Sequence, residues 1–74
     1  MEITIGVGNY EPVEAESYFV EFWYNRHDRL WVVTVYDNLD RQCDCQSCPD
    51  KAWRDGVIKE FSAKYNTQDI RHIK

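Results

Sequence analysis

The chain has 74 residues and a formal net charge of −4, from 13 acidic and 9 basic side chains. A chain of this length is expected to form one domain, residues 1–74, that buries only about 60% of its unfolded surface. Because the Lys and Arg residues are scattered and interleaved with the carboxylates, neither a nucleic-acid partner nor an acidic mimic of DNA is expected.

Composition also bears on the cellular compartment. No apolar run approaches the ~18 residues needed to cross a bilayer, and the first residues lack the charged and apolar regions of a secretory signal. Three cysteines are an odd number, unlike the even sets of secreted disulfide scaffolds. We therefore expect a cytoplasmic protein with reduced thiols and no membrane partner.

The segment before residue 17 carries one strand signal and no binding motif. Residues 3–7 alternate apolar with small or polar side chains, which predicts a short strand that adds to a sheet edge or covers its second face. Gly6 and Gly8 form a G-x-G, but Glu11 stands where a dinucleotide fingerprint has its third glycine. Residues 9–16 contain Pro12 and three glutamates, and they are predicted to form a surface connector.

Two runs rich in aromatic and β-branched residues follow, residues 18–24 and 30–36, separated by five polar residues. This pattern predicts a β-hairpin over residues 18–36. A five-residue loop would mix polar and apolar side chains on both faces, whereas a four-residue loop makes one face apolar throughout. We therefore expect the second register, with Phe22 opposite Trp31, Val20 opposite Val33 and Tyr18 opposite Val35.

The opposite face of the hairpin is the feature that bears on function. It is too apolar for an ordinary solvent-facing sheet, so the N-terminal strand, a second copy or a foreign partner should cover it. Its aromatic residues are of the types enriched at protein interfaces. The side chains expected on this face are Phe19, Glu21, Trp23, Leu30, Val32, Thr34 and Tyr36.

A turn over residues 37–40 and a third strand are predicted next. The turn is rich in Asp and Asn, which bond their own backbone where the chain reverses. Residues 42–46 then alternate polar side chains with cysteines, a period of two that indicates an edge strand. In this interpretation Cys43 and Cys45 face the core, while Gln42, Asp44 and Gln46 face away.

A helix is predicted over about residues 49–65, ending at Asn66. Ser47 or Cys48 is expected at the cap, with Pro49 in the first turn and Asp50 near the positive end of the helix dipole. An apolar stripe recurs every four residues, and Gly56 in the helix interior suggests that another element lies close to it. The stripe consists of Trp53, Val57, Ile58, Phe61 and Tyr65.

The predicted fold is α+β. It has a small antiparallel sheet with a three-stranded meander around the central hairpin, one helix packed on one sheet face, and a last short strand over residues 69–73, in the order β-β-β-β-α-β. The layout resembles an arrangement common among small uncharacterised bacterial and phage proteins. That resemblance concerns architecture and does not imply a function.

The cysteines offer three alternatives. Cys43, Cys45 and Cys48 with His27 or His72 would make a Cys₃His zinc set, but zinc needs sulfurs about 4 Å apart and therefore a knuckle in place of a strand. The C-x-x-C from Cys45 to Cys48 leads into a helix, as in redox proteins, but lacks the surrounding βαβ unit. We favour the third alternative, in which all are structural, and expect no bound metal and no cofactor.

No catalytic group emerges from the sequence. Neither His27 nor His72 has a nucleophile or a second base near it in sequence, so we expect no enzymatic activity. We predict a non-enzymatic protein–protein interaction module, an inhibitor or adaptor of the kind encoded by phages, that acts by occluding a surface of a foreign protein or forms a homodimer. The residues predicted to bind the partner are Phe19, Trp23, Leu30, Val32 and Tyr36 on the sheet, with Arg26 and Arg29 in the hairpin loop.

Overall fold

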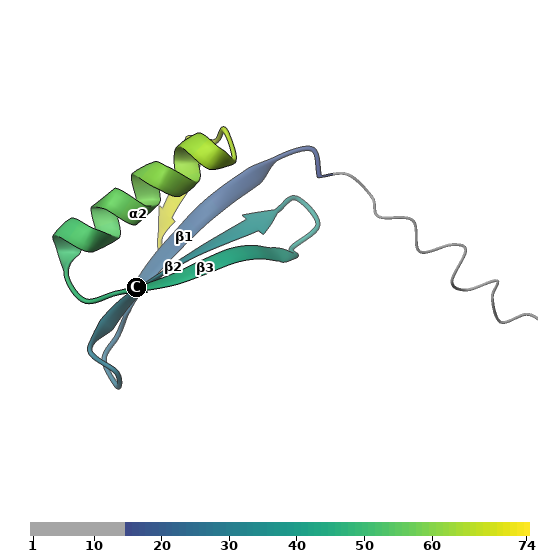
Figure 1. The fold of residues 1–74 in the computed structure, drawn as a ribbon. Helices are drawn as coiled ribbons and strands as arrows, with labels where there is room; N and C mark the ends of the chain where they lie inside the picture. The colour runs from purple at the N-terminus through teal and green to yellow at the C-terminus, as the bar shows by residue number, and fades with distance from the viewer. Residues whose placement is uncertain (1–14) are drawn as a thin grey trace, which may run out of the picture.

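A computed structural model describes residues 15–74 and shows an α+β fold, with one helix against one face of a sheet (Figure 1). The elements are β1 (Tyr18–Asn25), β2 (Leu30–Asp37), β3 (Gln42–Cys48), α2 (Lys51–Lys64) and β4 (Ile70–His72). No helix within this part of the chain is long and apolar enough to cross a membrane. The strand predicted over residues 3–7 lies outside the described residues.

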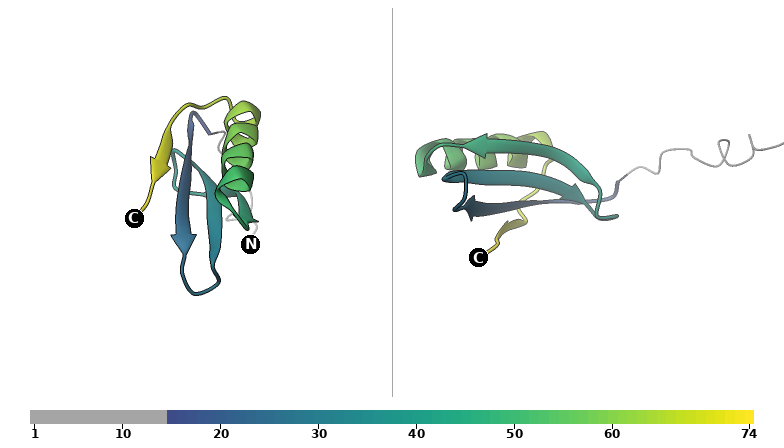
Figure 2. Two further views of the ribbon diagram at one scale, coloured as in Figure 1. Left: turned by 90° about the vertical axis from the view of Figure 1, so that its left-hand side faces the viewer. Right: turned by 90° about the horizontal axis from the view of Figure 1, so that it is seen from below.

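The sheet has four strands in the order β3-β2-β1-β4. The two hairpins are antiparallel as predicted, but β4 pairs parallel to β1, so the sheet is mixed and not purely antiparallel. The cause is the path of the chain. Because α2 runs back along the sheet, the chain enters β4 from the same end as β1, and the Val20 N–H donates to the Asp69 carbonyl at 2.9 Å. Figure 2 shows β4 at the side of the sheet away from the helix.

The hairpin has the predicted faces and the predicted four-residue loop, but its register differs by two residues. Phe22 lies opposite Val33, where Trp31 was expected, and Val20 lies opposite Val35. Both strands extend further because Asn25 starts the loop: its side-chain oxygen accepts the backbone N–H groups of His27 at 3.0 Å and Asp28 at 3.3 Å. A shift of two residues leaves every side chain on its expected face.

The core lies between α2 and the sheet face that it covers. Val20, Val33 and Val35 are fully buried there, and Val57 and Phe61 from the helix pack on them. Burial of these apolar side chains is the main stabilising contribution. The half-buried side chains around this core are Tyr18, Phe22, Trp31, Ile58 and Tyr65.

The helix begins and ends with local signals. The predicted caps Ser47 and Cys48 are wrong: the N-cap is Asp50, whose carboxylate accepts the Trp53 N–H at 2.8 Å. Pro49 therefore precedes the helix. Asn66 ends it as predicted, in the left-handed region at φ 51°.

Two predictions about the helix surface are also wrong. Trp53 does not join the buried stripe, since 56% of it is exposed. A Cβ at Gly56 would have no atom within 4 Å, so no other described element lies close to the helix there. Both residues lie on a side of α2 next to the buried stripe and are exposed.

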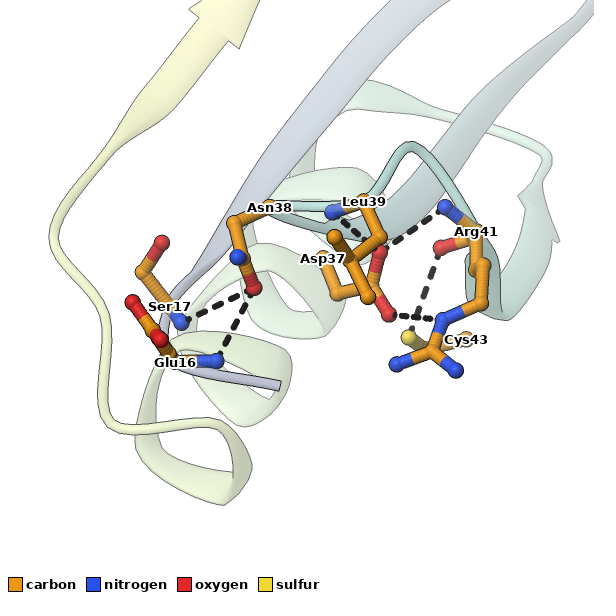
Figure 3. A network of polar contacts seen from close by, with 7 residues as sticks. All are labelled: Glu16, Ser17, Asp37, Asn38, Leu39, Arg41 and Cys43. Carbon is orange, nitrogen blue, oxygen red and sulfur yellow. Dashed lines mark hydrogen bonds and ion pairs between the residues drawn. The ribbon is translucent and has the colours of Figure 1, made fainter. Parts of the chain in front are cut away.

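The turn between β2 and β3 is organised by Asp37 (Figure 3). Its buried carboxylate accepts the N–H groups of Leu39 and Arg41 at 2.9 and 2.8 Å and Nε of Arg41 at 2.6 Å. Burial raises the pKa of this carboxyl, but these hydrogen bonds outweigh burial and hold the pKa below its ordinary value. Asn38 ties the start of β1 to the same turn by accepting the Glu16 N–H at 2.9 Å.

Candidate sheet-face interface

The candidate site is the sheet face opposite α2, which we call the outer face. Alternation along β1 and β2 places on it the five apolar residues predicted to bind a partner. No described element covers this face. Its side chains are Phe19, Glu21, Trp23, Leu30, Val32, Thr34 and Tyr36, together with Arg71 from β4.

Aromatic side chains form the centre of the outer face. Phe19 and Tyr36 are opposite each other across the two strands, and their rings stack with centroids 5.6 Å apart and planes 26° apart. Trp23 lies opposite Val32 in the same pair of strands, and 37% of it is exposed. Thr34 is 95% buried between them, so its hydroxyl offers little polar surface to water. The outer face is therefore apolar but open to contact.

Arg71 belongs to the outer face and was missed in the sequence. β4 sets it beside Glu21 on β1, and its guanidinium carbon lies 3.8 Å from the centroid of the Phe19 ring. Asp69 holds the guanidinium through two contacts, of 3.1 and 3.0 Å, which lower the pKa of that carboxyl. Only the β-branched residues Ile70 and Ile73 indicated a strand in this region, and they did not show which neighbour the strand would have.

Arg26 and Arg29 are not brought onto the outer face. Both are exposed in the loop beyond the last pair of the hairpin, Asn25 with Leu30. Arg29 has a φ of 56°, which the short loop requires to reverse the chain. The two arginines thus lie at one end of the apolar surface.

The cysteines do not occupy the predicted positions. Cys43 and Cys45 are exposed, whereas Cys48 is fully buried. Pairing with β2 sets Cys48 opposite Trp31 on the helix side and Cys45 opposite Thr34 on the outer face. Asp44 and Gln46 pair with Val35 and Val33 and so face the helix, which places Cys45 between them on the other side; the register shift between Val35 and Tyr36 lies beyond this stretch, next to Cys43.

This arrangement does not favour the metal and redox alternatives. Cys45 and Cys48 point to opposite sides of a strand and are separated by about 10 Å along it, too far for a disulfide or a shared zinc ion. Burial raises the pKa of the Cys48 thiol, the opposite of what an activated thiol requires. Among the described residues, no group of three His, Cys, Asp or Glu side chains is placed to hold a metal ion.

The histidines have different surroundings. His72 stacks on Phe22 on the helix side, with centroids 4.7 Å and planes 4° apart, so its ring has a packing contact. His27 is exposed in the hairpin loop.

Comparisons of the chain with protein-family profiles, with curated proteins and with solved structures give no significant match. The surfaces of this chain are therefore the basis for assigning it a function.

Proposed function

We propose that this protein is a non-enzymatic interaction module whose outer face binds a partner protein. The observation that carries the proposal is the set of aromatic and aliphatic side chains that β1 and β2 present on a face which no described element covers. Monomeric proteins rarely leave a large apolar patch open to water unless it has a binding role.

The composition of the outer face fits a protein partner better than a small ligand. Trp, Tyr and Arg are the residue types that most often dominate binding energy, and the outer face offers Trp23, Tyr36 and Arg71. The surface is a sheet without a deep pocket, and shape complementarity with a second protein surface would bury its side chains together. Glu21 and Arg71 carry opposite charges beside the apolar centre and would supply the polar rim.

A module of this kind works by occupying a surface of its partner, as an inhibitor or an adaptor does. Such a role needs no nucleophile, base or metal, only a matching apolar patch on the other protein. The chain has a net charge of −4, so a strongly acidic partner surface is disfavoured.

The test is affinity capture with two matched variants. Trp23→Ala combined with Val32→Ser removes two apolar side chains from the outer face, and Leu39→Ala removes an exposed apolar side chain from the β2–β3 turn. We expect wild type and Leu39→Ala to retain the same protein in comparable amounts. The double variant, shown to be folded by circular dichroism, should retain at least about tenfold less, a loss of about 1.4 kcal/mol. Equal retention by the double variant would contradict the proposal.

A further inference from the structure

β3 is an edge strand whose second edge pairs with no described strand. At the end of β2, the Asp37 N–H donates to the Arg41 carbonyl on the β3 side, and the next N–H, of Asn38, donates to the Ser17 carbonyl on the β1 side. Successive residues along β2 therefore direct their backbone groups alternately toward β3 and toward β1. By this alternation Cys45 and Ser47 direct their own backbone groups away from the sheet.

Outward backbone groups of Cys45 and Ser47 contact the side chains of the residues before them. The Cys45 N–H donates to Oδ1 of Asp44 at 3.1 Å, and the Ser47 carbonyl accepts from Nε2 of Gln46 at 3.2 Å. Both contacts are local and lie at the surface, so an added strand could replace them with ladder hydrogen bonds. The backbone edge is thus accessible over the central part of β3.

One flank of α2 lies along the same edge. The helix packs mainly on β2 and β3, and Lys64 reaches Asp44 of β3 at 3.0 Å. Glu60 and Trp53 precede Lys64 by about one and about three turns, so they share its side of the helix. Gly56 stands between them and leaves an open groove of about 560 Å³, which is lined by Trp53, Gly56, Val57, Lys59 and Glu60. In Figure 2 the helix runs on the side of the sheet away from β4.

We propose that this edge is the dimer interface of the protein: β3 pairs antiparallel with β3 of a second copy, around a two-fold axis at Cys45. The two sheets then form one continuous sheet, with both helices on the same side. Cys45 is the middle residue of Gln42–Cys48, so the axis lies at the centre of β3.

The side chains of β3 match their own copies in this register. Asp44 of each copy lies opposite Gln46 of the other, so a carboxylate acceptor meets an amide donor twice. Centring the axis on Asp44 would instead set two carboxylates opposite each other, which is destabilising. A two-fold interface uses each favourable pair twice, which favours a second copy over an unrelated strand.

The helices also fit this arrangement. Strands in a sheet are about 4.8 Å apart, so a helix above the gap between β2 and β3 lies about 4.8 Å from the axis. The two copies of α2 would then be about 10 Å apart, within the range of packed helices. Gly56 costs about 1 kcal/mol relative to Ala in a helix interior, and a close helix neighbour would explain its presence.

The native thiols supply a direct test. Directly opposed Cys45 residues would have Cα atoms about 5.5 Å apart, a separation that a disulfide spans. Diamide oxidation should therefore join two Cys45 thiols: the S–S bond forms as diamide takes up two protons and two electrons. We expect a covalent dimer from wild type and from Cys43→Ser, and none from Cys45→Ser. An equal dimer fraction from Cys45→Ser would overturn the proposal.

Sedimentation of the reduced protein separates this interface from the outer face. We expect wild type and the variant with Trp23→Ala and Val32→Ser to be dimers, whereas Gln46→Asp should weaken the dimer at least about tenfold because it sets a carboxylate opposite Asp44 of the other copy twice. Circular dichroism shows whether each variant is folded. A wild-type monomer at all accessible concentrations, or a dimer lost only with the outer-face variant, would refute pairing through β3.

Discussion

Cys48→Ser is expected to destabilise the protein strongly, whereas Cys43→Ser should not. Cys48 is fully buried, and its thiol donates to the Gln46 carbonyl over a long distance of 3.9 Å. A serine hydroxyl is shorter than a thiol, so it would be buried without a good hydrogen-bond partner. Burying such a group costs about 1–3 kcal/mol.

That cost is large for this chain. At roughly 0.05–0.15 kcal/mol per residue, a domain of this size unfolds with about 4–11 kcal/mol. Urea unfolding followed by circular dichroism gives the free energy of unfolding of each variant. This free energy should fall for Cys48→Ser and stay within about 0.5 kcal/mol of wild type for the exposed Cys43→Ser. In the native protein, a thiol reagent should label Cys43 and Cys45 rapidly and Cys48 only after unfolding. Rapid labelling of all three, or equal stability of the two variants, would refute the placement of Cys48 in the core.

Two further measurements address the helix and the pH dependence. Gly56→Ala should raise the unfolding free energy of the dilute monomer by about 1 kcal/mol, because no atom lies within 4 Å of the added Cβ. A lower unfolding free energy for this variant in urea would mean that the helix has a neighbour there. Asp44 has a lowered pKa, mainly through the hydrogen bond from Lys64. Hydrogen bonds from Arg41 and Leu39 lower the pKa of Asp37 despite its burial. A depressed pKa stabilises the fold above the unfolded value of about 3.9, so stability should fall as the pH drops below about 4, and Asp44→Asn should flatten that fall in urea titrations.

The sequence predicted the faces of the hairpin because a period of two survives an error in register. Phe22 and Val20 both pair two residues away from the expected position, yet they still face the helix. The four-residue loop was enough to fix the faces. The pairs themselves depend on where Asn25 starts the loop, and that is set by its hydrogen bonds to the following backbone.

The predicted facing of Cys43 and Cys45 was wrong because the alternation in β3 does not show which side of the strand faces the core. Gln-Cys-Asp-Cys-Gln has a clear period but no strongly apolar residue to show which side faces inward. Asp44 faces the helix side because Lys64 and Tyr65, at the end of α2, bond its carboxylate at 3.0 and 3.1 Å. This contact spans 20 residues and depends on the helix position, which no local pattern in β3 reveals.

Arg71 illustrates a different limit. Its contact with Phe19 exists only because the chain crosses the sheet and adds β4 beside β1. A three-residue strand carries too little pattern to identify its neighbour, so a residue that completes the outer face lay in a segment predicted only as a last strand.

The two proposed surfaces make separable demands on the same sheet. The outer face is perpendicular to the edge of β3, so pairing through that edge would leave the outer face free and set two copies of it side by side. A partner that presents two matching patches would then bind with an avidity that a single outer face lacks. Loss of the dimer through Gln46→Asp should therefore weaken binding to such a partner without removing it, whereas loss of Trp23 and Val32 should remove binding and leave the dimer intact. These opposite effects would assign recognition to the outer face and assembly to the edge of β3.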